Sequence, residues 1–136
     1  MSSKKGKTKP TNNYYMGLAL ALARENAGLT KENPSVGCVL VKNNQIISTG
    51  ITSENGRPHA EYNAVKNSAD NVSGSTAYVT MEPCTHKGKT DPCSSLLIKS
   101  KVKKVYFSVS DIDERTSNKA LKVFKRKGIV VKKGIL

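Results

Sequence analysis

The alternation of apolar and polar positions along this chain predicts five strands and four helices. Two apolar runs flank the polar tetrapeptide 42–45, which is the pattern of a β-hairpin. Apolar residues that recur every three or four positions predict the helices, and Gly28 and Gly128 are suited to end the first and the last of them. The expected strands are 36–41, 46–51, 76–81, 104–109 and 129–131. The expected helices are 14–27, 59–69, 92–99 and 117–127.

The order of these elements indicates the fold class. After an initial helix the order is β-β-α-β-α-β-α-β, which is typical of a layered α/β domain with helices packed on a mixed sheet. In such a domain the helix starts near His59 and Cys93 can meet at one edge of the sheet. Residues 1–13 are polar and rich in lysine, so we expect a disordered tail there and one domain over 14–136.

The positive charge of the chain invites a nucleic-acid-binding function, but the distribution of the charge argues against one. The 136 residues include 23 Lys or Arg and 10 Asp or Glu, a formal net charge of +13. Residues 1–10 contribute four lysines and residues 99–136 a net charge of +9, whereas residues 11–98 carry seven charges of each sign. The favoured interpretation is a basic protein without a nucleic-acid function, because the excess charge lies outside the segment that supplies the candidate chemistry.

The sequence also bears on location and on the state of the cysteines. It has no apolar run near the ~20 residues that span a membrane, and its basic start lacks the apolar segment of a secretory signal. A cytoplasmic location is therefore expected. Three cysteines are an odd number, which argues against a full disulfide framework. Cys38 lies in an apolar strand and is expected in the core, whereas Cys84 and Cys93 each follow a proline.

His59, Cys84 and Cys93 form a candidate zinc site. One imidazole and two thiolates meet the ligand count of a catalytic zinc, which keeps its fourth position for water. Thiolates favour zinc over magnesium, and helix N-termini stabilise them. A purely structural zinc would need a fourth protein ligand. His86, between the two cysteines, is the candidate for it, but we expect this side chain near substrate or solvent.

Glu61 is the candidate catalytic residue of a hydrolytic deaminase. Zinc can lower the pKa of bound water from 15.7 towards ~7. A carboxylate that takes a proton from that water and later delivers one to the departing nitrogen serves both steps of the reaction. Glu61 follows His59 by two residues, and residues two apart do not share a helix face. Their relative geometry therefore depends on where the helix begins.

The His-x-Glu and Pro-Cys pattern resembles the cytidine deaminase superfamily, whose nucleobase deaminases usually end in Pro-Cys-x-x-Cys. Here eight residues separate Cys84 from Cys93. The longer loop, Pro-Cys-Thr-His-Lys-Gly-Lys-Thr-Asp-Pro-Cys over 83–93, resembles that of the riboflavin-pathway pyrimidine deaminases. The segments Asn-Pro-Ser-Val-Gly at 33–37 and Gly-Arg-Pro-His-Ala-Glu at 56–61 are also similar to that family.

This resemblance implies a three-layer α/β/α fold with a central mixed sheet of about five strands. It implies deamination of 2,5-diamino-6-(5-phosphoribosylamino)pyrimidin-4(3H)-one to the 5-amino-2,4-dione, with release of ammonia. It carries the zinc-ligand roles to His59, Cys84 and Cys93, and the proton-shuttle role to Glu61. It also suggests substrate contacts from Asn33, Lys89 and Asp111. Lys89 has a further rationale, because a cation in the loop between the cysteines can pair with a substrate phosphate.

Two positions depart from the family pattern, and they bear on the substrate. Thr52 stands where family members often have histidine, and Asp113 stands where they usually have asparagine. An acid at position 113 would repel a nearby phosphate, which bears on the choice of substrate. A ribityl form of the pyrimidine is a second candidate substrate. The resemblance also implies a homo-oligomer and an NADPH-dependent reductase, in this protein or a separate one. The sequence has no Gly-x-Gly-x-x-Gly of its own.

Two other functions stay open. A tRNA or other nucleobase deaminase is favoured only by the overall charge, and the short cysteine spacing usual in those enzymes is absent. A non-catalytic, zinc-stabilised RNA-binding module would use the basic C-terminal segment. It predicts steeply salt-dependent RNA affinity without ammonia release, and it leaves Glu61 without a role.

Overall fold

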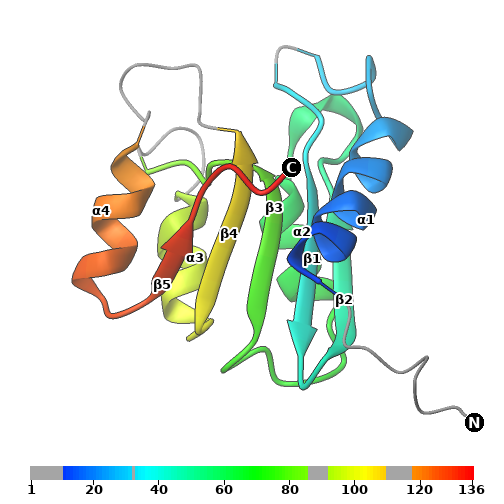
Figure 1. The fold of residues 1–136 in the computed structure, drawn as a ribbon. Helices are drawn as coiled ribbons and strands as arrows, with labels where there is room; N and C mark the ends of the chain where they lie inside the picture. Colours follow the sequence, from blue (N-terminus) through cyan, green and yellow to red (C-terminus); the bar gives the residue numbers. More distant parts are fainter. Residues whose placement is uncertain (1–10, 32, 86–91, 110–117) are drawn as a thin grey trace, which may run out of the picture.

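The computed structural model describes residues 11–31, 33–85, 92–109 and 118–136 (Figure 1). Its helices are α1 Asn12–Glu25, α2 Ala60–Asn67, α3 Cys93–Lys99 and α4 Lys119–Arg126, with a short 3-10 helix η1 at Glu54–Gly56. Its strands are β1 Gly37–Lys42, β2 Gln45–Ile51, β3 Thr76–Met81, β4 Lys104–Val109 and β5 Val130–Lys132. Among the described residues no helix is both long enough and apolar enough to cross a membrane.

The strands form one five-stranded mixed sheet in the order β2-β1-β3-β4-β5. Strands β1 and β2 pair antiparallel as the expected hairpin, and β1 also pairs antiparallel with β3. The pairs β3–β4 and β4–β5 are parallel. Parallel neighbours need a crossover connection, which α3 and α4 supply. Both the hairpin and the mixed sheet confirm the fold class expected from the sequence.

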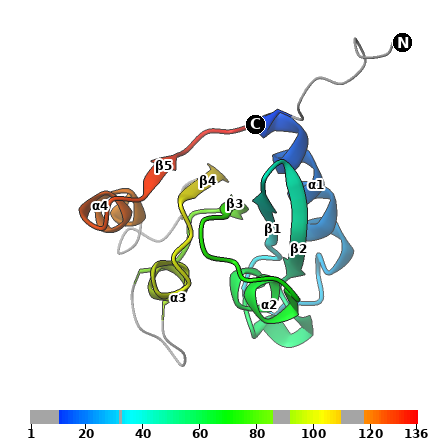
Figure 2. The same cartoon turned by 90° about the horizontal axis from the view of Figure 1, so that it is seen from below.

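Helices cover both faces of the sheet, which gives three layers (Figure 2). Helix α1 packs on one face through Met16 and Ala19, together with Ile135 from the C-terminal segment. Helices α2, α3 and α4 pack on the other face around Phe107 and Phe124, both of which are fully buried. The α/β/α architecture is therefore confirmed, with the candidate site residues on the face that carries α2 and α3.

The helix boundaries differ from the expected ones by a few residues, for local reasons. Helix α1 begins at Asn12 because the hydroxyl of Thr11 accepts the N–H of Tyr14 at 3.2 Å, a side-chain N-cap. Asn12 and Asn13, expected in the tail, therefore belong to the first helix. Helix α2 begins at Ala60, with His59 as its N-cap residue. Of the rest of the expected tail, Thr11 caps α1, and residues 1–10 lie outside the described residues.

Two glycines let helices approach the hairpin closely. A Cβ built on Gly37 would lie 2.0 Å from the carbonyl oxygen of Ala19 in α1. A Cβ built on Gly50 would lie 2.2 Å from the carbonyl oxygen of Ala60 and 2.4 Å from the amide nitrogen of Ala64, both in α2. Neither position has room for a side chain, so glycine fixes the separation between these helices and the sheet.

We predict that Gly50→Ala destabilises the fold by about 3 kcal/mol or more, because the new methyl group overlaps the backbone of α2. Urea unfolding followed by circular dichroism measures the change. The control is Gly17→Ala inside α1, where the nearest atom is Leu136 Cδ1 at 4.0 Å. That variant should gain up to ~1 kcal/mol, because alanine favours the helix over glycine. Equal losses in the two variants would contradict the close approach of α2.

Three tyrosines pack in a row between α1 and the sheet. The ring centroids of Tyr15 and Tyr78 are 5.2 Å apart, and those of Tyr78 and Tyr106 are 5.4 Å apart. The hydroxyl of Tyr78 donates a hydrogen bond to Oδ1 of Asn12 and so ties the start of α1 to the central strand β3. Burial, with a smaller contribution from the two neighbouring phenols, raises the pKa of Tyr78 to about 12.

This raised pKa predicts a loss of stability in strong alkali. Because the pKa is higher in the folded protein than the ~10 of an unfolded tyrosine, the contribution of Tyr78 is complete below about pH 10. It is lost as the pH rises towards about 12. The difference in unfolding free energy between wild type and Tyr78→Phe should therefore shrink by up to ~2 kcal/mol over that interval. Parallel pH profiles for the two proteins would count against this assignment.

Candidate functional site

The backbone around the start of α2 presents His59 towards the centre of the site. His59 is the N-cap residue, with extended backbone angles (φ −72°, ψ 165°), and its side chain makes no capping hydrogen bond. The side chain of Asn63 holds the segment that precedes His59, because Nδ2 of Asn63 donates to the carbonyl oxygen of Ile51 at 2.7 Å and to Oγ of Ser53 at 2.9 Å. The same group lies 3.3 Å from the carbonyl oxygen of Pro58.

Cys84 and Cys93 meet through the backbone at the start of α3. Cys93 is the first residue of that helix, and its N–H donates to Sγ of Cys84 at 3.2 Å. The N–H of Ser94 donates to the carbonyl oxygen of Cys84 at 3.1 Å. Two consecutive amides at a helix start thus hold the cysteine that follows β3, in a position that favours a thiolate.

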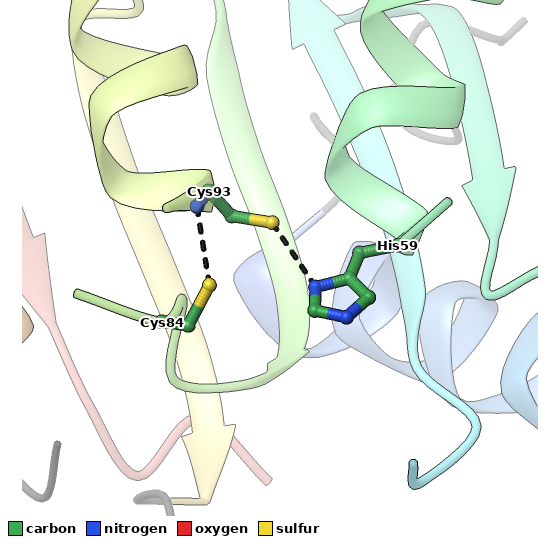
Figure 3. A group of neighbouring side chains, drawn as sticks. All are labelled: His59, Cys84 and Cys93. Carbon is green, nitrogen blue, oxygen red and sulfur yellow. Dashed lines mark hydrogen bonds between the residues drawn. The ribbon is translucent and has the colours of Figure 1, made fainter. Parts of the chain in front are cut away.

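The three candidate ligands converge on one point (Figure 3). Nδ1 of His59 lies 3.4 Å from Sγ of Cys93, and the ligand atoms of His59, Cys84 and Cys93 all lie within 4.8 Å of one another. Ligand atoms around a tetrahedral zinc ion are about 3–4 Å apart, since zinc–sulfur and zinc–nitrogen bonds are about 2.0–2.3 Å long. The donor atoms and their spacing therefore fit zinc, and the two helix starts meet as expected.

Hydrogen bonds among the three candidate ligands shift the pKa of each of them. Hydrogen bonding from Cys93 lowers the pKa of Cys84 to about 4, against the opposing effect of burial. The pKa of Cys93 is raised, because it shares a hydrogen bond with Cys84 and is itself buried. The pKa of His59 is also raised, chiefly by hydrogen bonding to Cys84. A metal ion would displace the proton that Cys93 retains, because thiols bind metals as thiolates.

Glu61 lies in the first turn of α2, beside this group, and only 4% of its surface is exposed. Burial raises the pKa of Glu61 to about 7, although the neighbouring His59 and a hydrogen bond from Cys93 act to lower it. The carboxyl group is therefore close enough to interact with both side chains. With a pKa near neutrality, it can both accept and release a proton at physiological pH.

Of the three residues expected to contact the substrate, the structure describes Asn33. Asn33 donates from Nδ2 to the carbonyl oxygen of Gly56 at 2.9 Å, and so it braces the segment that leads to His59. Thr52 is 1% exposed, and its hydroxyl accepts the N–H of Val36 at 2.9 Å. This hydrogen bond joins the residue before β1 to the residue after β2, at the open end of the hairpin. Lys89, Asp111, His86 and Asp113 lie outside the described residues.

Sequence reasoning missed Asn63, which shapes the approach to His59. The signal was its position four residues after the histidine, on the same side of the helix. An amide there can satisfy several carbonyl groups of a preceding loop at once. The partners of Asn63, residues 51, 53 and 58, could not be identified without the fold.

Comparison with known proteins gives a consistent result. The sequence model described as "Cytidine and deoxycytidylate deaminase zinc-binding region" matches residues 9–109. The chain is 44% identical over 122 residues to riboflavin biosynthesis protein RibD of Actinobacillus pleuropneumoniae, covering 90% of this chain and 32% of that protein. It is 43% identical over 123 residues to diaminohydroxyphosphoribosylamino-pyrimidine deaminase of Buchnera aphidicola (subspecies Acyrthosiphon pisum), covering 90% of this chain and 84% of that protein.

The fold is similar to that of solved structures as well. A structure of RibD from Acinetobacter baumannii superposes with a TM-score of 0.87 at 42% sequence identity, covering 91% of this chain and 35% of that one. The chain thus spans about a third of the length of the RibD proteins that it matches, but most of the Buchnera protein. Both the residue pattern and the fold are shared with deaminases.

The geometry predicts one zinc ion per chain, bound through two of the three cysteines. Cys84→Ser and Cys93→Ser should each lower the zinc content that survives dialysis against a weak chelator, as measured by mass spectrometry. Cys38→Ala is the matched control, because Cys38 is fully buried in β1 and is not one of the three converging ligands. Loss of zinc from Cys38→Ala equal to the loss from Cys93→Ser would contradict this ligand set.

Proposed function

The chain belongs to the cytidine and deoxycytidylate deaminase family, and from this membership we propose that it deaminates a pyrimidine intermediate of riboflavin biosynthesis. The substrate is 2,5-diamino-6-(5-phosphoribosylamino)pyrimidin-4(3H)-one, and the products are the 5-amino-2,4-dione and ammonia. The Buchnera relative, of which this chain covers 84%, is a diaminohydroxyphosphoribosylamino-pyrimidine deaminase, and this supports the proposed substrate. The observation that carries the proposal is the convergence of His59, Cys84 and Cys93 beside the buried Glu61.

We propose that His59, Cys84 and Cys93 hold the zinc ion. The family description supports the choice of metal, and the mixed imidazole and thiolate donor set is one that zinc prefers. A zinc ion bound there supplies Lewis acidity, which lowers the pKa of water towards ~7. The chain provides three ligands, so one position is left for water or substrate.

Glu61 is the proton carrier in this proposal. Its carboxylate takes a proton from the attacking water as a carbon–oxygen bond forms at the amine-bearing ring carbon, and passes it to the adjacent ring nitrogen, which receives the electrons of the broken C=N double bond. It then takes the remaining hydroxyl proton and delivers it to the amino nitrogen. The carbon–nitrogen bond breaks, ammonia leaves with the electron pair of that bond, and the carbonyl group of the dione forms. Burial, which raises the pKa of Glu61 above its usual range, helps the carboxyl group to hold a proton between the two transfers.

The contacts that select the substrate belong to Asn33, Lys89 and Asp111 in this proposal. The position of Asn33 beside the segment before His59 supports a place for it near the reacting ring. Thr52 has a shorter side chain than histidine, and its hydroxyl accepts the N–H of Val36. Because Thr52 and Asp113 both depart from the family pattern, the ribityl form of the pyrimidine is the first alternative substrate to assay. A homo-oligomer and a reductase partner or domain complete the proposal by analogy with the family.

The test is ammonia release from the ribosyl phosphate substrate by zinc-loaded protein, compared with Glu61→Gln. We expect the rate to fall by about 10²–10⁴-fold, since general acid–base catalysis contributes that much. Zinc content should be unchanged, because Glu61 is not among the three ligands. Glu54→Gln in η1 is the matched control, because Glu54 is exposed, and it should keep full activity.

The other outcomes identify which part of the proposal is wrong. Equal activity in Glu61→Gln and wild type would remove Glu61 from the mechanism. Ammonia release from the ribityl compound alone would change the substrate but keep the reaction. If zinc-loaded wild type releases ammonia from neither compound, and instead binds RNA with a steep dependence on salt, the chain would be the RNA-binding module considered above.

A further inference from the structure

A second buried carboxylate, Glu82, lies next to the site without belonging to the ligand group. Only 3% of its surface is exposed, and it immediately follows β3. Its Oε1 accepts the N–H of Asn118 at 3.0 Å, and its Oε2 accepts the N–H of Ala120 at 3.0 Å. These two amides belong to the start of α4, where the side chain of Asn118 makes no capping hydrogen bond. Glu82 therefore caps a helix that begins 37 residues later in the sequence.

The backbone of Glu82 is held as well. Its N–H donates to the carbonyl oxygen of Val109, the last residue of β4, at 2.9 Å. One residue thus binds both the end of β4 and the start of α4. Its side chain and backbone fix these two points relative to each other.

The connection from Glu82 to Cys84 is short and stiff. Pro83, between them, is fully buried, and its ring fixes one of the backbone angles. At the other end, Cys84 accepts hydrogen bonds from the amides of Cys93 and Ser94 at the start of α3. The segment 82–84 therefore runs from α4 to α3 with its two ends held by helix-start amides.

We propose that Glu82 is a positioning residue for Cys84. By fixing segment 82–84 to α4, it sets where the Cys84 thiolate meets His59 and Cys93. This inference rests on the proposed metal site and on these three residues as ligands, but it does not depend on the identity of the substrate. The competing explanation is that Glu82 only stabilises α4, as any helix cap does.

Cobalt(II) substitution separates the two explanations. Cobalt bound by thiolates absorbs visible light, and its bands respond to the geometry of the sulfur ligands, so the spectrum reports on Cys84 without any enzyme assay. The experiment compares full-length wild type with Glu82→Gln, which preserves size but presents an amide N–H₂ to one of the two backbone amides. Lys122→Gly, at an exposed position within α4, is the control that weakens the helix without touching Glu82.

We expect Glu82→Gln to shift the cobalt bands and to weaken zinc binding by roughly tenfold in competition with a chelator. Lys122→Gly should lower the melting temperature and leave both quantities unchanged. If Glu82→Gln does not accumulate as folded protein, Glu82→Asp, which keeps the charge but has a shorter reach, should give a smaller shift of the same kind.

An unaltered cobalt spectrum and unaltered zinc affinity in the folded Glu82 variants would overturn the inference. So would an equal change in Lys122→Gly, because α4 stability alone would then explain the effect. Wild type that shows the thiolate–cobalt bands but releases no ammonia would contradict the proposed reaction and leave the role of Glu82 intact. Wild type without those bands would overturn the metal site and the role of Glu82 together.

Discussion

The close contact between α2 and β2 is the constraint on which the site depends. Gly50 has no side chain, and the backbone of α2 occupies the space where one would be. This contact determines how far the first turn of α2, with His59 and Glu61, lies from the sheet. Asn63 then holds the segment that leads into that turn. The positions of His59 and Glu61 are thus set by direct packing of one backbone against another, which is more rigid than packing between side chains.

Much of the fold, and the grouping of the three candidate ligands, could be predicted from the sequence. Strands 76–81 and 104–109 have the expected bounds, because alternating and apolar runs are strong local signals. The convergence of His59 with Cys93 was predictable from two helix starts at one edge of a sheet. The hydrogen bonds of Glu82 to Asn118 and Ala120 were not, because no local pattern records a partner 36 or 38 residues away. The start of α1 at Asn12 was missed because a single threonine cap decided it.

The net charge of the protein does not account for the pKa of Glu61. The chain as a whole carries a formal charge of +13, which by itself would favour the ionised form of a carboxyl group. The pKa of Glu61 is nevertheless raised to about 7, because the group is buried and loses its hydration. Burial outweighs the distant lysines since exposed charges are screened by solvent and salt within about 10 Å. The basic surface therefore carries little information about the chemistry.

The hydrogen bonds of Glu82 also bear on how the protein matures during synthesis. A chain leaving the ribosome presents His59, Cys84 and Cys93 before Asn118 and Ala120 have been added. Until α4 has been synthesised, the segment that holds Cys84 lacks the hydrogen bonds that the amides of Asn118 and Ala120 donate to Glu82. At the proposed metal site, a metal ion that bound early would meet a loosely arranged group of ligands, and the final arrangement would follow only after α4 had been synthesised. Binding of the metal and synthesis of α4 would thereby be linked in time.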